Sequence, residues 1–218
     1  DNSLKLPPLS VSKLLRKYNL IPDNRIGQNF LVDPIALERV INTADLSAED
    51  NVLEIGAGLG SLTRYLCVST ERVIAVELDE KLLPPLSDAL SKFHNVEVIH
   101  GDILTLDLGE LIDQPGYKVV ANIPYYITSK LIRHLFESDL SPSQIVLTVQ
   151  YEVAMRICAL PGKMSMLALA VQVYGYPQIR GKIPAGAFYP IPKVDSAIVR
   201  VDIYSQPIIN PQHLNTFF

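Results

Sequence analysis

Four consecutive residues, Asn122-Ile123-Pro124-Tyr125, combine the groups needed to hold a planar base that carries an exocyclic amine. The asparagine side chain offers a carbonyl oxygen as acceptor. Proline has no N–H but keeps its carbonyl and fixes the turn, and tyrosine offers a flat ring. The hydrophobic run at 117–121 predicts a buried parallel strand, and open α/β sheets bind ligands at the carboxyl ends of such strands. A strand-ending turn with a packed tyrosine is the plain alternative.

A glycine-rich turn follows another predicted strand, at 51–55, and leads into a predicted helix at 61–68. The turn reads Gly56-Ala57-Gly58-Leu59-Gly60, and glycines let the backbone come close to a ligand at the start of a helix. The spacing differs from the Gly-x-Gly-x-x-Gly of dinucleotide-binding folds, and a lone glycine-rich turn is weak evidence. Its place between a strand and a helix strengthens the case for a ligand.

Acidic residues close the next two predicted strands. Glu77 lies where a carboxylate can accept hydrogen bonds from both ribose hydroxyls. Asp102 can accept from an adenine amine, and Ile103 can cover the ring. With Glu54 and Gly56 these residues mark three successive strand ends, so the sequence predicts a cofactor of the nucleoside type.

Upstream of these strands, the adjacent amides of Gln28 and Asn29 stand in a predicted loop and can bind a polar ligand. Asp33 and Pro34 predict the start of a helix, with the aspartate as its cap. The apolar face expected for this helix consists of Ile35, Leu37, Val40, Ile41 and Ala44.

Strands and helices alternate along most of the chain, which predicts a doubly wound α/β sheet. The last two predicted strands, at 178–183 and 196–203, form an antiparallel hairpin. Seven strands ending in a hairpin fit the class I S-adenosylmethionine-dependent methyltransferase (Rossmann-like) fold, a mostly parallel sheet with helices on both faces. A nicotinamide oxidoreductase would need the longer glycine spacing and a catalytic His, Lys or Tyr, so it is the weaker alternative. The remaining predicted strands are 51–55, 72–76, 96–100, 117–121 and 144–150.

Charge is distributed unevenly in a chain of net charge −4. Residues 33–113 carry sixteen acidic and five basic groups, whereas residues 114–200 carry nine basic and four acidic groups. This asymmetry favours two different ligands, one of them a polyanion, over an evenly solvated surface. Near the start of the chain, phosphates could be contacted by Lys13, Arg16, Lys17 and Arg25.

The composition indicates a globular cytoplasmic protein, with 48% hydrophobic residues over 218 positions. No apolar run approaches the ~20 residues that span a bilayer, so no membrane partner is expected. Cys67 and Cys158 are expected to be buried free thiols in helices. Four scattered histidines give no metal-ligand spacing, and no metal is expected.

Five segments of the chain, in order, resemble those of the ribosomal RNA adenine N6,N6-dimethyltransferases, most of all the small-subunit branch of that family. Each segment alone is weak, but together they are highly specific and cover roughly Ile26 to Val201. They are Gly27 to Leu31, Glu54 to Thr63, Gly101-Asp102, Asn122 to Tyr125 and Phe188 to Ser196.

The resemblance implies S-adenosylmethionine as cofactor. At the positions that match the family's motifs, the resemblance implies that Gln28, Asn29 and Leu31 close over the methionine end of the cofactor. Gly56 would approach it through the backbone, Glu77 would hold the ribose, Asp102 the adenine, and Asn122 would touch both cofactor and target. The predicted cofactor site also contains Glu54, Gly58, Leu78 and Ile103.

The resemblance also implies the substrate: two adjacent adenosines in the 3′-terminal hairpin of small-subunit rRNA, with the small ribosomal subunit as partner of a monomeric enzyme. We expect an arm and basic helix at 1–25, the catalytic domain at 26–205, and the start of a C-terminal helical domain at 206–218. The family's usual Gln-Lys-Glu segment is Gln150-Tyr151-Glu152 here, which removes one positive group near the RNA.

As a mechanism, we expect a flipped adenosine stacked between Tyr125 and Phe188. The side-chain oxygen of Asn122 and the carbonyl of Pro124 would accept both amine hydrogens and free the nitrogen lone pair for attack. Three alternatives stay open: a large-subunit adenine dimethyltransferase of the macrolide-resistance type, a non-catalytic ribosome-assembly or transcription factor on the same fold, and the nicotinamide oxidoreductase.

Overall fold

A computed structural model describes residues 6–23, 27–123, 127–137 and 140–209. The strands are β1 (Phe30–Leu31), β2 (Asn51–Ile55), β3 (Arg72–Glu77), β4 (Val96–His100), β5 (Lys118–Asn122), β6 (Gln144–Gln150), β7 (Gly175–Ile183), β8 (Phe188–Tyr189) and β9 (Ser196–Ile203). The α-helices are α1 (Val11–Lys17), α2 (Pro34–Ala44), α3 (Ser61–Ser69), α4 (Leu83–Leu90), α5 (Leu108–Leu111), α6 (Thr128–Glu137), α7 (Tyr151–Ile157) and α8 (Met166–Gln172). Short 3-10 turns are η2 (Glu80–Leu82) and η4 (Ala185–Ala187).

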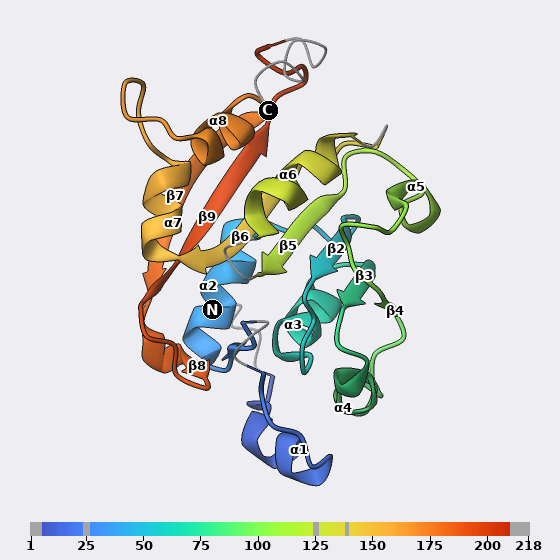
Figure 1. Ribbon diagram of the computed structural model, residues 1–218. Helices are drawn as coiled ribbons and strands as arrows, with labels where there is room; N and C mark the ends of the chain where they lie inside the picture. Colours follow the sequence, from blue (N-terminus) through green and yellow to red (C-terminus); the bar gives the residue numbers. More distant parts are fainter. Residues whose placement is uncertain (1–5, 24–26, 124–126, 138–139, 210–218) are drawn as a thin grey trace.

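A seven-stranded sheet in the order β4-β3-β2-β5-β6-β9-β7 runs through the protein (Figure 1). The strands from β4 to β6 pair in parallel, whereas β9 is antiparallel to both of its neighbours, β6 and β7. The predicted mostly parallel seven-stranded sheet with a final antiparallel hairpin is therefore confirmed. The two short strands β1 and β8 pair with each other in a separate ribbon.

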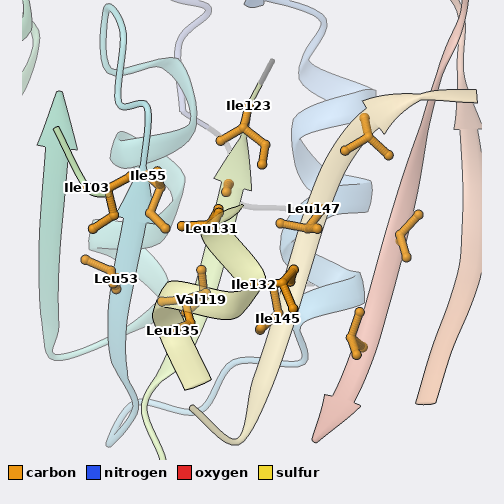
Figure 2. Packing of buried hydrophobic residues seen from close by; sticks show 14 of the residues in the cluster. Leu53, Ile55, Ile103, Val119, Ile123, Leu131, Ile132, Leu135, Ile145 and Leu147 are labelled. Atoms are coloured by element: carbon orange, nitrogen blue, oxygen red, sulfur yellow. The ribbon is translucent and has the colours of Figure 1, made fainter. Parts of the chain in front are cut away.

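Helices cover both faces of the sheet, as the sequence predicts. Successive strand residues point to opposite faces. Leu53 and Ile55 of β2 belong to the core that also contains residues of α6, α7 and α8, whereas Val52 belongs to the core with residues of α2 and α3. Figure 2 shows the first of these two cores, in which Leu131 and Leu135 of α6 lie among apolar side chains of the strands. Parallel strands buried on both sides are rich in Val, Ile and Leu.

Helix α2 begins as expected, because the Asp33 side chain accepts a hydrogen bond from the backbone N–H of Ala36 at 2.7 Å and Pro34 occupies the first turn. Four of the five residues predicted for its apolar face are buried. The prediction for Ile35 is wrong: its side chain is 69% exposed, on the side of the helix turned away from the sheet.

The prediction for Cys158 is wrong in part, since this residue follows the end of α7 and is only half-buried, whereas Cys67 lies buried in α3.

The basic helix α1 packs on the rest of the protein through one apolar edge. Val11 and Leu15 are buried against a small cluster that includes Phe30, Leu59 and Leu82. On its polar side, Lys17 is not free for a phosphate, because it forms an ion pair with Asp88 of α4 at 2.6 Å.

Within the described part of the chain, no helix is long and apolar enough to span a membrane.

Candidate cofactor and substrate site

The carboxyl ends of β2, β3, β4 and β5 meet at one edge of the sheet, since these strands are parallel neighbours. A cavity of about 280 Å³ opens there, close to the lower end of ordinary ligand pockets. Nine predicted cofactor residues line it: Gln28, Asn29, Gly56, Gly58, Glu77, Leu78, Asp102, Ile103 and Asn122. Segments far apart in the sequence thus form the wall of a single cavity.

The glycine turn after β2 requires glycine at two of these positions. Gly56 has φ +79° and Gly58 has φ +58°, in the left-handed region that L side chains rarely adopt. A Cβ on Gly56 would lie 3.2 Å from the backbone oxygen of Asn122, and one on Gly58 would lie 3.0 Å from the Phe30 ring. Both strain and crowding therefore explain why the turn is built from glycine.

Glu77, the last residue of β3, holds the turn in place. One of its carboxylate oxygens accepts a hydrogen bond from the Gly58 N–H at 2.7 Å, and the other accepts from the Asp79 N–H at 2.8 Å. The side chain is mostly buried, and this burial raises the pKa of Glu77 above its ordinary value. Each oxygen keeps a second lone pair, so the carboxylate can still accept from a ligand in the cavity.

At the end of β4, a carboxylate and apolar side chains form another part of the wall. Asp102 is exposed, and its Oδ1 accepts a hydrogen bond from the Leu104 N–H at 3.0 Å. Ile103 is buried in the apolar core, whereas Leu78 beyond β3 is half exposed. All of them line the cavity, so this end offers both an acceptor and an apolar surface to a flat ring.

Asn122, the last residue of β5, is joined to the segment that precedes β1. Its side-chain nitrogen donates to the backbone oxygen of Asn29 at 3.2 Å. Because the Asn29 carbonyl can only accept, this contact assigns the nitrogen end of the amide. Asn122 lines the cavity, and no described residue donates a hydrogen bond to the oxygen end of its amide.

Gln28 spans two other parts of the chain. Its side-chain oxygen accepts from the Asp23 N–H at 2.7 Å, and its nitrogen donates to the Asp79 carboxylate at 2.7 Å. The neighbouring Asn29 side chain donates to the Gly27 carbonyl at 3.3 Å. The segment before β1 is thereby tied to the end of β3, across the cavity mouth.

Glu54 and Leu31 line a second, smaller cavity of about 30 Å³ on the other side of the glycine turn, where Gly56, Gly58 and Asn122 also contribute. Glu54 alternates with Leu53 and Ile55 along β2, so its side chain points to the α3 face. The carboxyl group is 1% exposed, and its Oε2 has no partner among the described residues. Burial, with the charge of Glu77 as a smaller cause, raises the pKa of Glu54 to about 8.

Of the predicted substrate residues, Phe188 lies in β8 with its backbone paired to Leu31. Its ring is 4% exposed and packs in the apolar core between the sheet and α2. Pro124 and Tyr125 lie outside the described residues, so the slot between two rings stays a prediction.

Two positive groups escaped the sequence reasoning. Lys130 of α6 lines the larger cavity, although the sequence assigns it no role. Lys182 of β7 lies 5.3 Å above the ring of Tyr151 and forms an ion pair with Asp195 at 2.7 Å. The family usually has lysine at the position of Tyr151. In this chain Lys182 of β7 supplies positive charge beside Tyr151 instead. The antiparallel pairings of β9 with β6 and with β7 bring these segments together.

Comparison with known proteins agrees with this geometry. Residues 23–218 match the sequence profile of a family described as "Ribosomal RNA adenine dimethylase". The chain belongs to the ribosomal RNA adenine dimethylase family. It thus has the class I methyltransferase fold, is an S-adenosylmethionine-dependent enzyme by family, and is not a nicotinamide oxidoreductase.

Two curated members of the adenine dimethylase family are both named "Ribosomal RNA small subunit methyltransferase A". The protein from Lachnoclostridium phytofermentans is 39% identical over 97% of this chain and 75% of its own length. The one from Dehalococcoides mccartyi is 43% identical over 88% of this chain and 66% of its own length.

Two solved structures are similar as well. A dimethyladenosine transferase from Plasmodium falciparum has a TM-score of 0.71 at 30% identity, covering 80% of this chain and 63% of its own. The 23S rRNA methyltransferase ErmE has a TM-score of 0.74 at 31% identity, covering 87% of this chain and 75% of its own. This chain therefore spans between 63% and 75% of the length of the four relatives.

Proposed function

We propose that the protein transfers methyl groups from S-adenosylmethionine to the N6 amines of two adjacent adenosines in the 3′-terminal hairpin of small-subunit rRNA. The curated relatives, named for the small subunit, support this choice of RNA. The observation that carries the chemistry is the orientation of Asn122, whose amide oxygen remains an acceptor where the cofactor cavity ends.

The cavity suits the cofactor by the chemistry of its donor and acceptor groups. Glu77 would accept from the ribose hydroxyls, Asp102 would accept from the adenine amine, and Ile103 with Leu78 would cover the ring faces. The backbone of Gly56 and Gly58 would lie against the amino-acid end, which Gln28, Asn29 and Leu31 close. Glu54 would face the amino-acid end of the cofactor from the other side of the glycine turn. When bound, S-adenosylmethionine supplies an electrophilic methyl group.

The adenine amine is a weak nucleophile, because its lone pair is delocalised into the ring. The amide oxygen of Asn122 would accept one amine hydrogen and the carbonyl of Pro124 the other. This draws the nitrogen towards a tetrahedral shape and frees its lone pair. Tyr125 would hold the base by stacking, which is worth about 1–3 kcal/mol per base. Phe188 would join it only after its ring leaves the apolar core in which it is buried. The proton on the methylated nitrogen then leaves to water, so positioning and electrostatics provide the catalysis.

Transfer of tritiated methyl groups to isolated ribosomal subunits tests this function. We expect label in undermethylated small subunits and none in large subunits, and loss of the label with Asn122→Ala. Label in large subunits alone would establish the macrolide-resistance type of activity, to which the similarity with ErmE points. Cofactor binding without transfer to either subunit would establish the non-catalytic assembly factor.

The remaining features of the proposed function concern the whole protein. We place the enzyme in the cytoplasm as a monomer that acts on the small ribosomal subunit. The division into an N-terminal arm and helix at 1–25, a catalytic domain at 26–205 and the start of a helical domain at 206–218 is part of the same proposal. Sedimentation with and without small subunits would test the monomer and its partner.

A further inference from the structure

Lys130 introduces a positive charge into a cavity whose other charged walls are acidic. It is exposed on α6, and among the described residues that line the larger cavity it is the one basic side chain, beside Glu77 and Asp102. Within the part of the chain that the structure describes, it forms no ion pair. An ammonium that lines the same cavity as two carboxylates, and has no ion-pair partner among the described residues, requires an explanation.

The packing of α6 determines where this ammonium can reach. Lys130 and His134 are four residues apart and therefore share one face of the helix. The His134 Nε2 lies 3.1 Å from the backbone oxygen of Leu106, so this face lies against the loop that follows β4. Helical side chains lean toward the helix start, which directs Lys130 past Ile127 to the end of the cavity formed by Asp102 and its neighbours.

Asp102 is the carboxylate at this end of the cavity that can pair with the Lys130 ammonium. Its Oδ1 already accepts from the Leu104 N–H, at 3.0 Å, which holds the carboxylate in place. A carboxylate has about four acceptor positions, so Asp102 can accept from both a base amine and an ammonium.

We propose that Lys130 swings onto Asp102 when a purine nucleoside is bound and latches the adenine end of the cavity. The ammonium pairs with the carboxylate, and the methylene stem covers the edge of the base. A rotamer change is enough for this, because the lysine stem is long and exposed. The inference rests on the proposed function for the identity of the cofactor. It makes Lys130 a determinant of nucleoside affinity, as distinct from a phosphate contact for RNA, which the neighbouring carboxylates would repel.

Calorimetric titration with S-adenosylhomocysteine and with 5′-methylthioadenosine tests the latch. The second compound keeps the adenine and ribose but lacks the amino-acid group. We expect Lys130→Met to raise the dissociation constants of both ligands by the same factor, roughly three- to tenfold, as for a partly exposed charge pair. Lys130→Arg should bind both ligands nearly as the unchanged protein does. Lys163→Met, an exposed lysine that does not line the cavity, is the matched control and should have no effect.

Asp102→Asn and the double variant complete the test. If Lys130 acts through Asp102, the double variant should bind no more weakly than Asp102→Asn alone. Additive losses, binding by Lys130→Met within twofold of the unchanged protein, or a loss confined to an RNA hairpin would each overturn the latch. Absence of S-adenosylhomocysteine binding by the unchanged protein would instead reject the proposed function together with the latch.

Discussion

The side-chain nitrogen of Asn122 donates to the main-chain oxygen of Asn29 at 3.2 Å, across 93 positions of sequence. The contact links the end of β5 to the segment that closes the cavity. It also means that the amide cannot turn over without placing two acceptor oxygens against each other. A single hydrogen bond therefore assigns the nitrogen and oxygen ends of the Asn122 amide.

Replacing Asn122 by alanine removes the acceptor and should lower kcat by roughly 100- to 1000-fold, as for loss of one preorganised polar group. S-adenosylhomocysteine should still bind, although more weakly, because the other lining residues remain while the link from Asn122 to Asn29 is lost. Single-turnover methyl transfer and calorimetry measure the two effects separately. Asn122→Asp is the matched variant, because it keeps the shape but places an oxygen against the Asn29 carbonyl. Turnover near that of the unchanged enzyme in either variant would contradict the assigned role.

Gly56→Ala should weaken both cofactor binding and the fold. Alanine at φ +79° costs about 1–2 kcal/mol of stability. The added Cβ, 3.2 Å from the Asn122 oxygen, also displaces the end of β5. We expect about tenfold weaker S-adenosylhomocysteine binding, which is about 1.4 kcal/mol.

Gly116→Ala is the control for that substitution, because Gly116 has φ +85° with no atom within 4 Å of the added Cβ. It should lose a similar free energy of unfolding in urea while binding the ligand normally. Equal ligand affinity in the two alanine variants would show that the approach to Asn122 has no consequence for the cavity.

Glu54 should make the stability of the protein fall as pH rises. The unfolded chain releases this proton near its ordinary pKa of 4.5, whereas the folded protein keeps it up to about 8. Between these values the folded state binds more protons, so stability is highest below the lower value and declines by up to about 1.4 kcal/mol per pH unit. Glu54→Gln should remove this part of the slope. Urea unfolding at pH 5.5, 6.5 and 7.5 measures the free energy of unfolding of the unchanged protein and of Glu54→Gln. If the two free energies change with pH in parallel, Glu54 is not a buried neutral acid.

Lys182→Met should weaken binding of a small-subunit RNA hairpin without changing S-adenosylhomocysteine affinity. Lys182 lies over Tyr151 in the basic half of the chain, and loss of one phosphate contact reduces the salt slope of binding by about one. Its ion pair with Asp195 is largely exposed and adds little to stability. Lys163→Met serves again as the reference, and an unchanged salt slope would exclude Lys182 from the RNA surface.

Local patterns were sufficient for most of the architecture. Apolar runs such as that of β6 mark buried parallel strands, and Asp33 with Pro34 marks the start of α2. Because parallel strands end at one edge, Gly56, Glu77 and Asp102 could be placed together from sequence. The prediction for Ile35 is wrong because helical spacing of about 100° per residue puts it opposite Leu37 and Ala44, on the exposed side of α2.

The rest of the site depends on tertiary packing. Glu54 was grouped with the cofactor residues, but strand alternation places it beneath the turn. Lys130 could not be recognised, because its role depends on the contact of His134 with Leu106. The link between Asn122 and Asn29 joins segments whose proximity no local pattern encodes.

The pairing of β1 with β8 affects how the protein is made. Phe30 and Leu31 find their backbone partners only in Tyr189 and Phe188. During translation, the first of these strands leaves the ribosome long before the second is synthesised. The strand ends that surround the cavity can assemble earlier, but the wall next to Asn29 gains the support of β8 only after Phe188 and Tyr189 have been synthesised. Closure of this wall of the cavity thus waits for the synthesis of β8.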